Sequence, residues 1–246
     1  MSEVYCGDVP ILSLKNVSRR YPGAVSLLVD INFDVWPGEF VYITGPSGSG
    51  KTTLLKIVYK GEKIESGSIF FCGKDVTNLS PSSVPYLRRN MGIVFQHFNL
   101  IDWMTVEENI AIPLEILGCD EKKINKRISA ILERVGLKGY EKIYVSKLSG
   151  GEQQRVAAAR AAVSKPPIIL ADEPTGNLDQ TSASAIISLL EDFTKDGTTV
   201  IVATHDELLL ASRSHRTMAV MGGKLIDVDY ANSVRHRKVV EAMEAA

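Results

Sequence analysis

The chain alternates short apolar runs, rich in β-branched residues, with longer stretches in which apolar positions recur at helical spacing. Four of the runs predict buried strands, at residues 40–44, 91–95, 168–171 and 198–204. Helical spacing follows several of them, most clearly over residues 181–194, where Ala185, Ile186, Leu189, Leu190 and Phe193 share one side. Strands that alternate with helices predict an α/β fold with a mainly parallel sheet covered on both faces.

Other segments do not fit this alternation. Residues 11–17 and 31–35 alternate between apolar and polar positions, which predicts half-buried antiparallel strands in an N-terminal β subdomain. A further strand is expected at residues 69–72, and a last strand or hairpin at residues 218–228.

The middle of the chain has no strong strand signal. Residues 82–89 predict a short helix, and residues 106–117 and 124–135 carry helical spacing, with a basic solvated face on the second. We therefore expect one domain over residues 1–230, with a core and β subdomain at about 1–95 and 165–230. An inserted α-helical subdomain occupies about 96–164, and residues 231–246 form a tail of no legible role.

Composition narrows the class of protein. The 246 residues are 45% hydrophobic and 23% charged with a formal net charge of −1, which describes a soluble globular protein and gives no reason to expect nucleic acid as a partner. No apolar run approaches the ~18 residues of a membrane-spanning helix, so no direct membrane insertion is expected. The three cysteines, Cys6, Cys72 and Cys119, lack metal or redox spacing, and we interpret them as reduced thiols of a cytosolic protein.

A glycine-rich turn follows the strand at residues 40–44 and fits G-x-x-x-x-G-K-[ST] at every fixed position. Residues with small side chains let consecutive backbone N–H groups surround phosphate oxygens at a helix N-terminus. Lys51 then supplies a cation for the β- and γ-phosphates, and Thr52 a hydroxyl for Mg²⁺. The alternative is a Gly/Ser-rich loop before an ordinary helix. The nucleotide-binding residues predicted here are Gly45, Pro46, Ser47, Gly48, Ser49, Gly50, Lys51, Thr52 and Thr53.

Candidate catalytic groups end the later strands. Asp172 and Glu173 come directly after residues 168–171, and Pro174 disfavours helix at Glu173. At this edge of an α/β sheet, Asp172 is the predicted metal ligand and Glu173 the predicted general base. His205 ends the next strand and is expected to hydrogen-bond a γ-phosphate or the attacking water. A solvated acidic pair and a structural histidine are the alternatives.

The segment Leu148–Arg155, LSGGEQQR, precedes an alanine-rich helix. Ser149 and Glu152 have the spacing of a capping box, which by itself explains a well-capped helix. The two glycines favour instead an anion that approaches the helix N-terminus closely. Such a second phosphate site is reconciled with the first if it serves a nucleotide held by another copy of the protein.

Taken together, GPSGSGKT, Gln96, LSGGEQQR, Asp172-Glu173, Asn177-Leu178-Asp179 and His205 follow the order found in ATP-binding cassette ATPases, and the chain resembles that family over residues 11–228. The resemblance implies a P-loop NTPase core that binds ATP and Mg²⁺ and hydrolyses ATP, with Lys51, Glu173 and His205 as catalytic residues. It implies a head-to-tail homodimer in the ATP-bound state, in which Ser149, Gly150 and Gly151 contact the γ-phosphate held by the other subunit. It also makes Tyr21 the adenine-stacking residue, Gln96 a Mg²⁺ and water contact beside Thr52 and Asp172, and Asp179 a residue of the dimer seam. Glu152 replaces the glutamine commonest in the family, and we expect little consequence.

Within the family, SVPYLRRNMGIVFQ, NIAIPLEILG and ADEPTGNLD are most similar to the bacterial cell-division cassettes. This implies a cytoplasmic ATPase, peripheral on the inner face of the bacterial cell membrane, that acts on a polytopic membrane protein of the FtsX type. The segment from His97 to Trp103 is where such a partner is expected to dock. Lipoprotein-release and macrolide-export cassettes share part of the pattern and remain an alternative. A soluble cassette acting on DNA or ribosomes is a further one, which the absence of long coiled coils or a second cassette does not favour.

Overall fold

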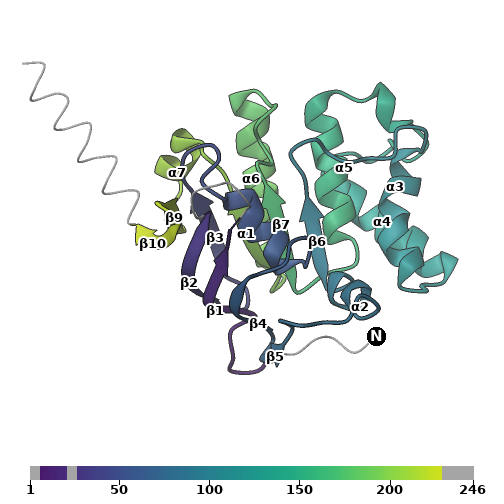
Figure 1. The fold of residues 1–246 in the computed structure, drawn as a ribbon. Helices are drawn as coiled ribbons and strands as arrows, with labels where there is room; N and C mark the ends of the chain where they lie inside the picture. Colours follow the sequence, from purple (N-terminus) through teal and green to yellow (C-terminus); the bar gives the residue numbers. More distant parts are fainter. Residues whose placement is uncertain (1–5, 21–26, 229–246) are drawn as a thin grey trace, which may run out of the picture.

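The fold was analysed in a computed structural model, which describes residues 6–20 and 27–228 (Figure 1). Within these residues, six strands form one sheet in the order β10-β9-β3-β8-β7-β6. β9 and β10 pair antiparallel, and every other pairing in this sheet is parallel. The strands are β3 (Phe40–Thr44), β6 (Met91–Val94), β7 (Ile168–Asp172), β8 (Thr199–Ala203), β9 (Arg216–Met221) and β10 (Lys224–Val228).

Both faces of this sheet are buried, as the continuous apolar runs predict. In β8, Val200 and Val202 belong to one hydrophobic cluster, while Ile201 and Ala203 belong to another on the opposite face. Successive side chains of a strand point to opposite faces, so a run without polar positions requires a layer on each side. Helices α5 (Gly150–Ala162) and α6 (Gln180–Thr194) supply the first layer, and α1 (Lys51–Val58) contributes to the second.

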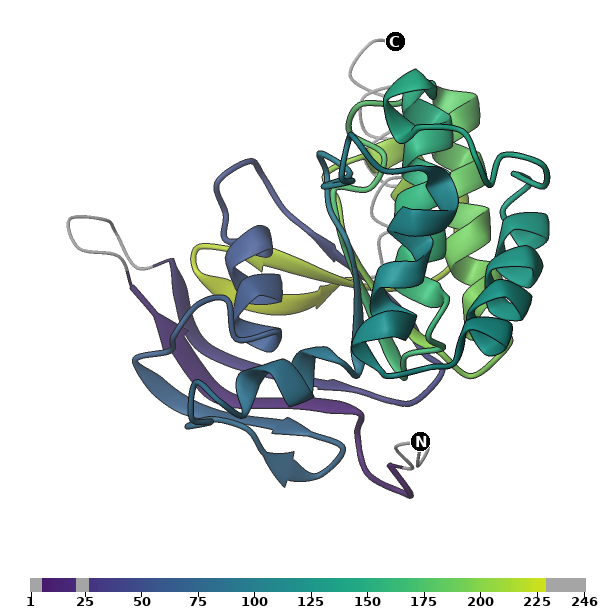
Figure 2. The same cartoon turned by 90° about the vertical axis from the view of Figure 1, so that its right-hand side faces the viewer.

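A second, antiparallel sheet completes the layer on the α1 side. Its strands are arranged in the order β2-β1-β4-β5, and apolar side chains from it share a cluster with those of α1. In Figure 2, α1 lies between the two sheets. This confirms the predicted N-terminal β subdomain; the strands are β1 (Leu12–Arg19), β2 (Leu28–Val35), β4 (Ser66–Phe71) and β5 (Lys74–Asp75).

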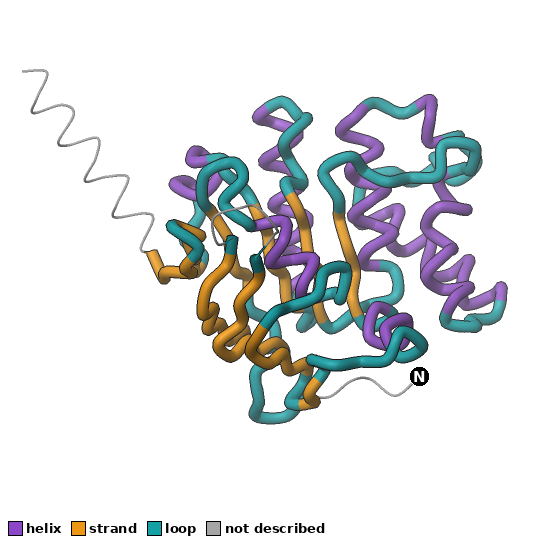
Figure 3. Tube along the Cα trace, viewed as in Figure 1, coloured by secondary structure: helices purple, strands orange, loops and turns teal. Residues whose placement is uncertain are grey.

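Helices gather beyond the β6 edge of the main sheet (Figure 3). They are α3 (Val106–Ile116), α4 (Glu121–Arg134) and the 3₁₀ turn η1 (Val145–Lys147), followed by α5. The short helix α2 (Val84–Arg88) precedes β6 and buries Leu87 in the cluster on the α1 side. On α4, Ile128, Ile131 and Leu132 are buried, which confirms the predicted apolar face. The short helix α7 (Glu207–Ser212) was not predicted, because six residues are too few to show a helical period. None of the described helices has the length and hydrophobicity needed to cross a bilayer.

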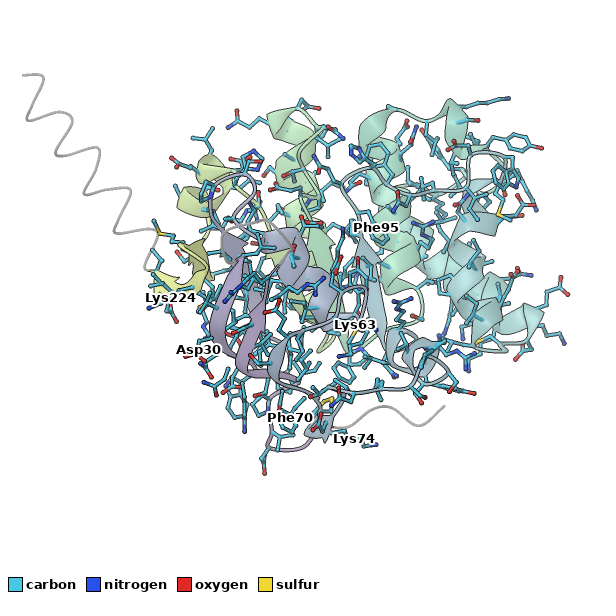
Figure 4. All side chains as sticks on the ribbon, in the orientation of Figure 1. Asp30, Lys63, Phe70, Lys74, Phe95 and Lys224 are labelled. Atoms are coloured by element: carbon cyan, nitrogen blue, oxygen red, sulfur yellow. A yellow bond between two sulfur atoms is a disulfide. The ribbon has the colours of Figure 1, made fainter. Side chains whose placement is uncertain are left out.

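The prediction of three reduced thiols is wrong for two of them. Cys6 and Cys72 form a disulfide, seen in Figure 4 as the yellow bond beside Phe70 and Lys74, whereas Cys119 is free. The two residues are 66 positions apart in sequence, but β1 pairs with β4, and the Cys72 amide donates to the Ile11 carbonyl. That pairing leaves their Cα atoms 4.6 Å apart. Cysteine spacing along the chain carries no information on a contact made by strand pairing.

Gly92 of β6 allows α5 to pack directly on the sheet. A Cβ atom at this position would lie 2.3 Å from the Ala161 carbonyl oxygen near the end of α5. Any side chain here therefore forces the helix away from the sheet.

We predict that Gly92→Ala lowers the free energy of unfolding by about 1–3 kcal/mol, because overpacking displaces a buried helix. Urea denaturation followed by circular dichroism measures the change. Gly150→Ala, at the other end of α5, is the matched control, since its new methyl group meets Leu178 and Phe98 at an ordinary 3.8 Å. An unchanged midpoint for Gly92→Ala would contradict the close contact between β6 and α5.

Candidate active site

The carboxyl ends of the central parallel strands meet at one edge of the sheet, and a hollow of about 340 Å³ lies there. Its walls come from the glycine-rich turn after β3, from Gln96 after β6, from Glu173 after β7 and from His205 after β8. The structure thus brings together groups that lie up to 178 residues apart in sequence, between Leu27 and His205. The lining residues are Leu27, Ser47, Gly48, Gly50, Lys51, Thr52, Thr53, Gln96, Glu173 and His205.

The glycine-rich turn has a backbone that other residues would not adopt. Gly45 has a φ of 141°, and a Cβ atom on it would lie 2.6 Å from the Val220 carbonyl oxygen of β9. Gly50, with a φ of 110°, is the N-cap residue of α1. Glycine at these positions lets the chain turn sharply into the helix, which points the N-terminus of α1 into the hollow.

Lys51 is folded back onto the turn that precedes it. Its side chain is 6% exposed, and Nζ donates hydrogen bonds to the carbonyl oxygens of Gly45 at 2.8 Å and Pro46 at 3.2 Å. The same Nζ lies 3.7 Å from Glu173 Oε1. The protein therefore keeps this buried cation satisfied by its own oxygens at the place where an anion would bind.

Thr52 and Asp172 place two oxygen ligands side by side. The Thr52 hydroxyl donates to Asp172 Oδ1 at 2.9 Å, across 120 residues of sequence. Burial raises the pKa of the Asp172 carboxyl, the hydrogen bond from Thr52 opposes this rise, and the neighbouring Glu173 charge adds to it. Hydroxyl and carboxylate oxygens suit Mg²⁺, which keeps several waters and needs few protein ligands. Accordingly, no group of three or more His, Cys, Asp and Glu side chains in the described part of the chain is placed to hold a metal ion by itself.

Glu173 faces away from this pair, toward the basic side of the hollow. Its backbone has a φ of 46°, which is unusual for a residue with a side chain, and its amide donates to the Ala203 carbonyl of β8 at 2.8 Å. Glu173 Oε1 lies 2.8 Å from His205 Nδ1, and the carboxylate side chain is 12% exposed against 63% for the imidazole. The two adjacent carboxylates thus point to different partners, because the left-handed backbone at Glu173, which is neither helical nor extended, turns its side chain toward His205. Backbone strain of this kind is common where a side chain must be held in a functional orientation.

Ser149, Gly150, Gly151 and Asp179 line a different hollow. It measures about 410 Å³, lies where the N-termini of α5 and α6 come together, and shares no lining residue with the first. Ser149 and Gly150 are exposed, and the capping box between Ser149 and Glu152 is present. Asp179 caps α6 through the Ser182 amide at 3.0 Å. Gln96 lies between the two hollows, because it lines the first and its carbonyl accepts from Asn177, which lines the second.

The structure extends the site beyond the residues predicted from the sequence, and one predicted residue lies outside the described part of the chain. Pro46 and Ser49 line a neighbouring hollow of about 450 Å³, together with Val220, Gly222, Gly223 and Lys224 of the β9–β10 hairpin. The sequence predicted a strand or hairpin at residues 218–228 but gave no signal that it borders the glycine-rich turn. Figure 4 shows Lys224 at the opposite end of the sheet from Phe95, which precedes Gln96. Tyr21, the predicted adenine contact, lies outside the described residues, but Leu27 lines both hollows beside the glycine-rich turn.

Comparison with known proteins agrees with this geometry. The family model described as "ABC transporter" matches residues 28–176. The "Cell division ATP-binding protein FtsE" of Escherichia coli K12 is 45% identical over 215 residues, which cover 87% of this chain and 97% of that protein. The protein of the same name from Bacillus subtilis strain 168 is 40% identical over 216 residues, which cover 88% of this chain and 95% of that protein.

Solved structures show the same fold. The ATP-binding cassette MJ0796, in a dimeric post-hydrolysis state bound to ADP and Pi, has a TM-score of 0.79 and 36% identity, and the match covers 87% of this chain and 96% of that one. The cassette cbiO1 from Clostridium perfringens, part of the transporter complex cbiONQ, has a TM-score of 0.86 and 28% identity, with 97% and 96% covered.

The buried Asp172 charge predicts a pH-dependent stability. Its folded-state pKa is raised, so the folded protein loses stability as pH rises from the unfolded-state value through the folded-state value. With nucleotide and metal removed, we expect Asp172→Asn to melt about 2–4 °C above the parent at pH 7.5, which corresponds to roughly 1 kcal/mol for a chain of this length.

This difference should shrink as the pH falls toward the ordinary carboxyl range of about 4, because the folded-state carboxyl is then increasingly protonated and destabilises the fold less. Differential scanning calorimetry at the two pH values measures it. Asp102→Asn removes an exposed carboxylate from the loop before α3 and serves as the control. A difference in melting temperature that does not change with pH would contradict the assignment.

Proposed function

Because the chain belongs to the ABC transporter family, we propose that it is the ATP-binding and ATP-hydrolysing subunit of a membrane complex that acts in bacterial cell division. The division role is supported by the cell-division ATP-binding proteins FtsE of Escherichia coli and Bacillus subtilis, which the chain matches over almost their whole length. These relatives favour division over the export alternative.

One observation carries the proposal for how the subunit works. The groups suited to a triphosphate are divided between two hollows that share no residue: Lys51, Glu173 and His205 lie in one, and Ser149 to Gly151 in the other. Gly150 is exposed and so accessible to a neighbouring molecule. A head-to-tail homodimer joins the first hollow of each copy to the second hollow of the other, and MJ0796, at 36% identity, forms a dimer. Two ATP molecules then complete two sites at the seam.

Each residue has a defined task in this arrangement. The backbone amides of the turn and Lys51, released from the Gly45 and Pro46 carbonyls, hold the β- and γ-phosphates. Glu173 accepts a proton from the water that attacks the γ-phosphorus, and the bond to the β–γ bridging oxygen breaks; a general base of this kind typically contributes 10²–10⁴-fold. His205, 2.8 Å from Glu173, orients that carboxylate and faces the phosphate. Tyr21 stacks on the adenine, and Asp179 lies at the seam.

Thr52 and Asp172, with Gln96 at the end of β6, are the residues that would hold Mg²⁺, and their oxygen donors fit this ion. Bound there, the ion neutralises charge on the β- and γ-phosphate oxygens during transfer.

A groove on the side of the molecule beyond β6 is our proposed docking site for the membrane partner. It measures about 580 Å³ and includes Asn99 and Ile101 from the segment between His97 and Trp103. Its lining is largely apolar, with the exposed Arg88 and Arg89 at its rim and the half-buried Arg160 within it.

None of the three arginines has a carboxylate partner among the described residues. Arg88 and Arg160 donate to backbone carbonyls, Arg89 lies over the Tyr86 ring, and burial lowers the pKa of Arg160. The fitting partner segment is therefore amphipathic, with acidic residues beside an apolar face. A cytoplasmic segment of a polytopic, FtsX-type protein would provide it and would hold the subunit at the inner face of the membrane.

The dimer proposal predicts opposite effects for two variants. Glu173→Gln removes the base but leaves the phosphate-binding groups in place, so it should bind ATP, form a stable dimer and lose at least about 100-fold in turnover. Lys51→Ala should bind ATP poorly and stay monomeric. Light scattering with saturating ATP and Mg²⁺ measures the mass, and a monomeric Glu173→Gln protein would rule out the shared-site arrangement.

The docking proposal predicts that Arg89→Glu, in the groove rim, reduces co-purification of the protein with a polytopic membrane protein from bacterial membranes at least severalfold. Its ATP-dependent dimerisation in solution should not change, because Arg89 lines neither hollow of the seam. Lys126→Glu, on the exposed face of α4, makes the same charge change away from the groove and should co-purify normally. Equal losses for both variants would contradict the groove as the docking site.

A further inference from the structure

Glu152 accepts a hydrogen bond from the Ser149 hydroxyl, the group that the proposed dimer needs for contact with the γ-phosphate of the facing subunit. Ser149 Oγ donates its proton to Glu152 Oε2 at 2.6 Å, and the Ser149 backbone N–H donates to the same oxygen at 2.8 Å. The sequence led us to expect little consequence from a glutamate at this position. The geometry changes that expectation, because the carboxylate contacts the serine of the signature segment directly.

A serine hydroxyl has a single proton to donate. While Ser149 donates to Glu152, it has no proton left for a phosphate oxygen of a nucleotide in the facing subunit. A charged carboxylate accepts this proton more strongly than the neutral amide oxygen of a glutamine would. Closure of the dimer on a triphosphate therefore requires that Ser149 exchange one anionic acceptor for another.

The carboxylate also brings negative charge to the hollow that faces the triphosphate. The hydrogen bonds from the Ser149 hydroxyl and backbone N–H lower the pKa of Glu152, so the group stays ionised at neutral pH. Within the described residues no salt bridge neutralises it. The positive charge of Arg155 makes only the smallest contribution to this lowering of the pKa. Arg155 Nε is buried without a hydrogen-bond partner among the described residues. Two anions that approach at a closing interface repel each other.

We propose that Glu152 is a positioning residue that holds Ser149 in the open state and opposes ATP-dependent closure, so that closure stays readily reversible. On closure the Ser149 hydroxyl turns its hydrogen bond from Glu152 Oε2 to an oxygen of the γ-phosphate across the seam. Its Oγ continues to accept a hydrogen bond from the Glu152 amide. This inference rests on the shared-site dimer proposed above. In addition to that dimer, it assigns to Glu152 the role of setting the ATP concentration at which the two subunits close.

The chain contains another capping box with the same hydrogen bonds, and its glutamate lines neither of the two hollows. At the start of α3, Thr105 Oγ1 donates to Glu108 Oε2 at 2.9 Å and the Thr105 amide donates to it at 2.7 Å. The hydrogen bonds from hydroxyl and amide thus repeat those of Ser149 and Glu152. Glu108 does not line either hollow of the seam, so a change there reports only on helix capping.

The experiment uses the full chain in a Glu173→Gln background, in which bound ATP is not consumed. Glu152→Gln and Glu108→Gln are each added to it, and the dimer dissociation constant with MgATP is measured by analytical ultracentrifugation at 50 mM and 500 mM KCl. Thermal denaturation shows whether each variant is folded.

We expect Glu152→Gln to lower the dissociation constant about tenfold at 50 mM KCl, the size of effect that removal of one close like-charge contact can produce. The advantage should narrow at 500 mM KCl, because salt screens a repulsion between charges but does not screen the loss of a cap. Glu108→Gln should leave the constant unchanged at both salt concentrations.

Several results would overturn the inference: an unchanged or weaker dimer for Glu152→Gln, an advantage that persists undiminished at high salt, or an equal gain from Glu108→Gln. If the Glu173→Gln parent itself stays monomeric with MgATP, the shared-site dimer fails, and the inference fails with it. If the parent forms a dimer and Glu152→Gln does not strengthen it, only the role of Glu152 fails.

Discussion

Ala203 of β8 pairs with Ile43 of β3 on one side and with Asp172 of β7 on the other, and the site depends on this parallel register. It makes the three strands end together, so that the glycine-rich turn, Glu173 and His205 leave the sheet at the same edge. A slip of one residue in a strand would turn its side chains to the opposite face. The two apolar layers oppose such a slip, because alternate residues of β8 are buried in different clusters.

The charges at this edge of the sheet are paired with one another and with backbone oxygens. Lys51 is shared between two backbone carbonyls and lies 3.7 Å from Glu173, and Glu173 in turn lies 2.8 Å from His205. These contacts satisfy the buried groups of the free protein. In the proposed mechanism a triphosphate and an attacking water use these same atoms, so binding replaces one set of partners by another instead of creating charge in an apolar setting.

Helix α5 connects three surfaces of the molecule. Its N-terminus carries Ser149 and Gly150 into the second hollow, its Ala161 packs against Gly92 of β6, and its Arg160 donates to the carbonyls of Phe98 and Asn99 in the groove proposed for the membrane partner. Because a packed helix moves as a unit, displacement of the proposed docking groove would also shift Ser149 and Gly150 at the proposed seam.

Local spacing in the sequence was enough to predict much of this protein. The buried strand from Phe40 to Thr44, the glycine-rich turn, the capping box at Ser149 and the carboxylates at the end of β7 all depend on residues within a few positions of one another. Contacts between distant segments were decided only by the tertiary structure. The disulfide between Cys6 and Cys72 follows from strand pairing, the bond between Thr52 and Asp172 from strand order, and the separation of the two hollows from the packing of α5. Even within a local motif the side-chain partner was undecided, since the sequence specified the cap but not that the Ser149 hydroxyl donates its hydrogen bond to the Glu152 carboxylate. Spacing defines which backbone groups meet, whereas burial and the surrounding charges determine which atoms bond.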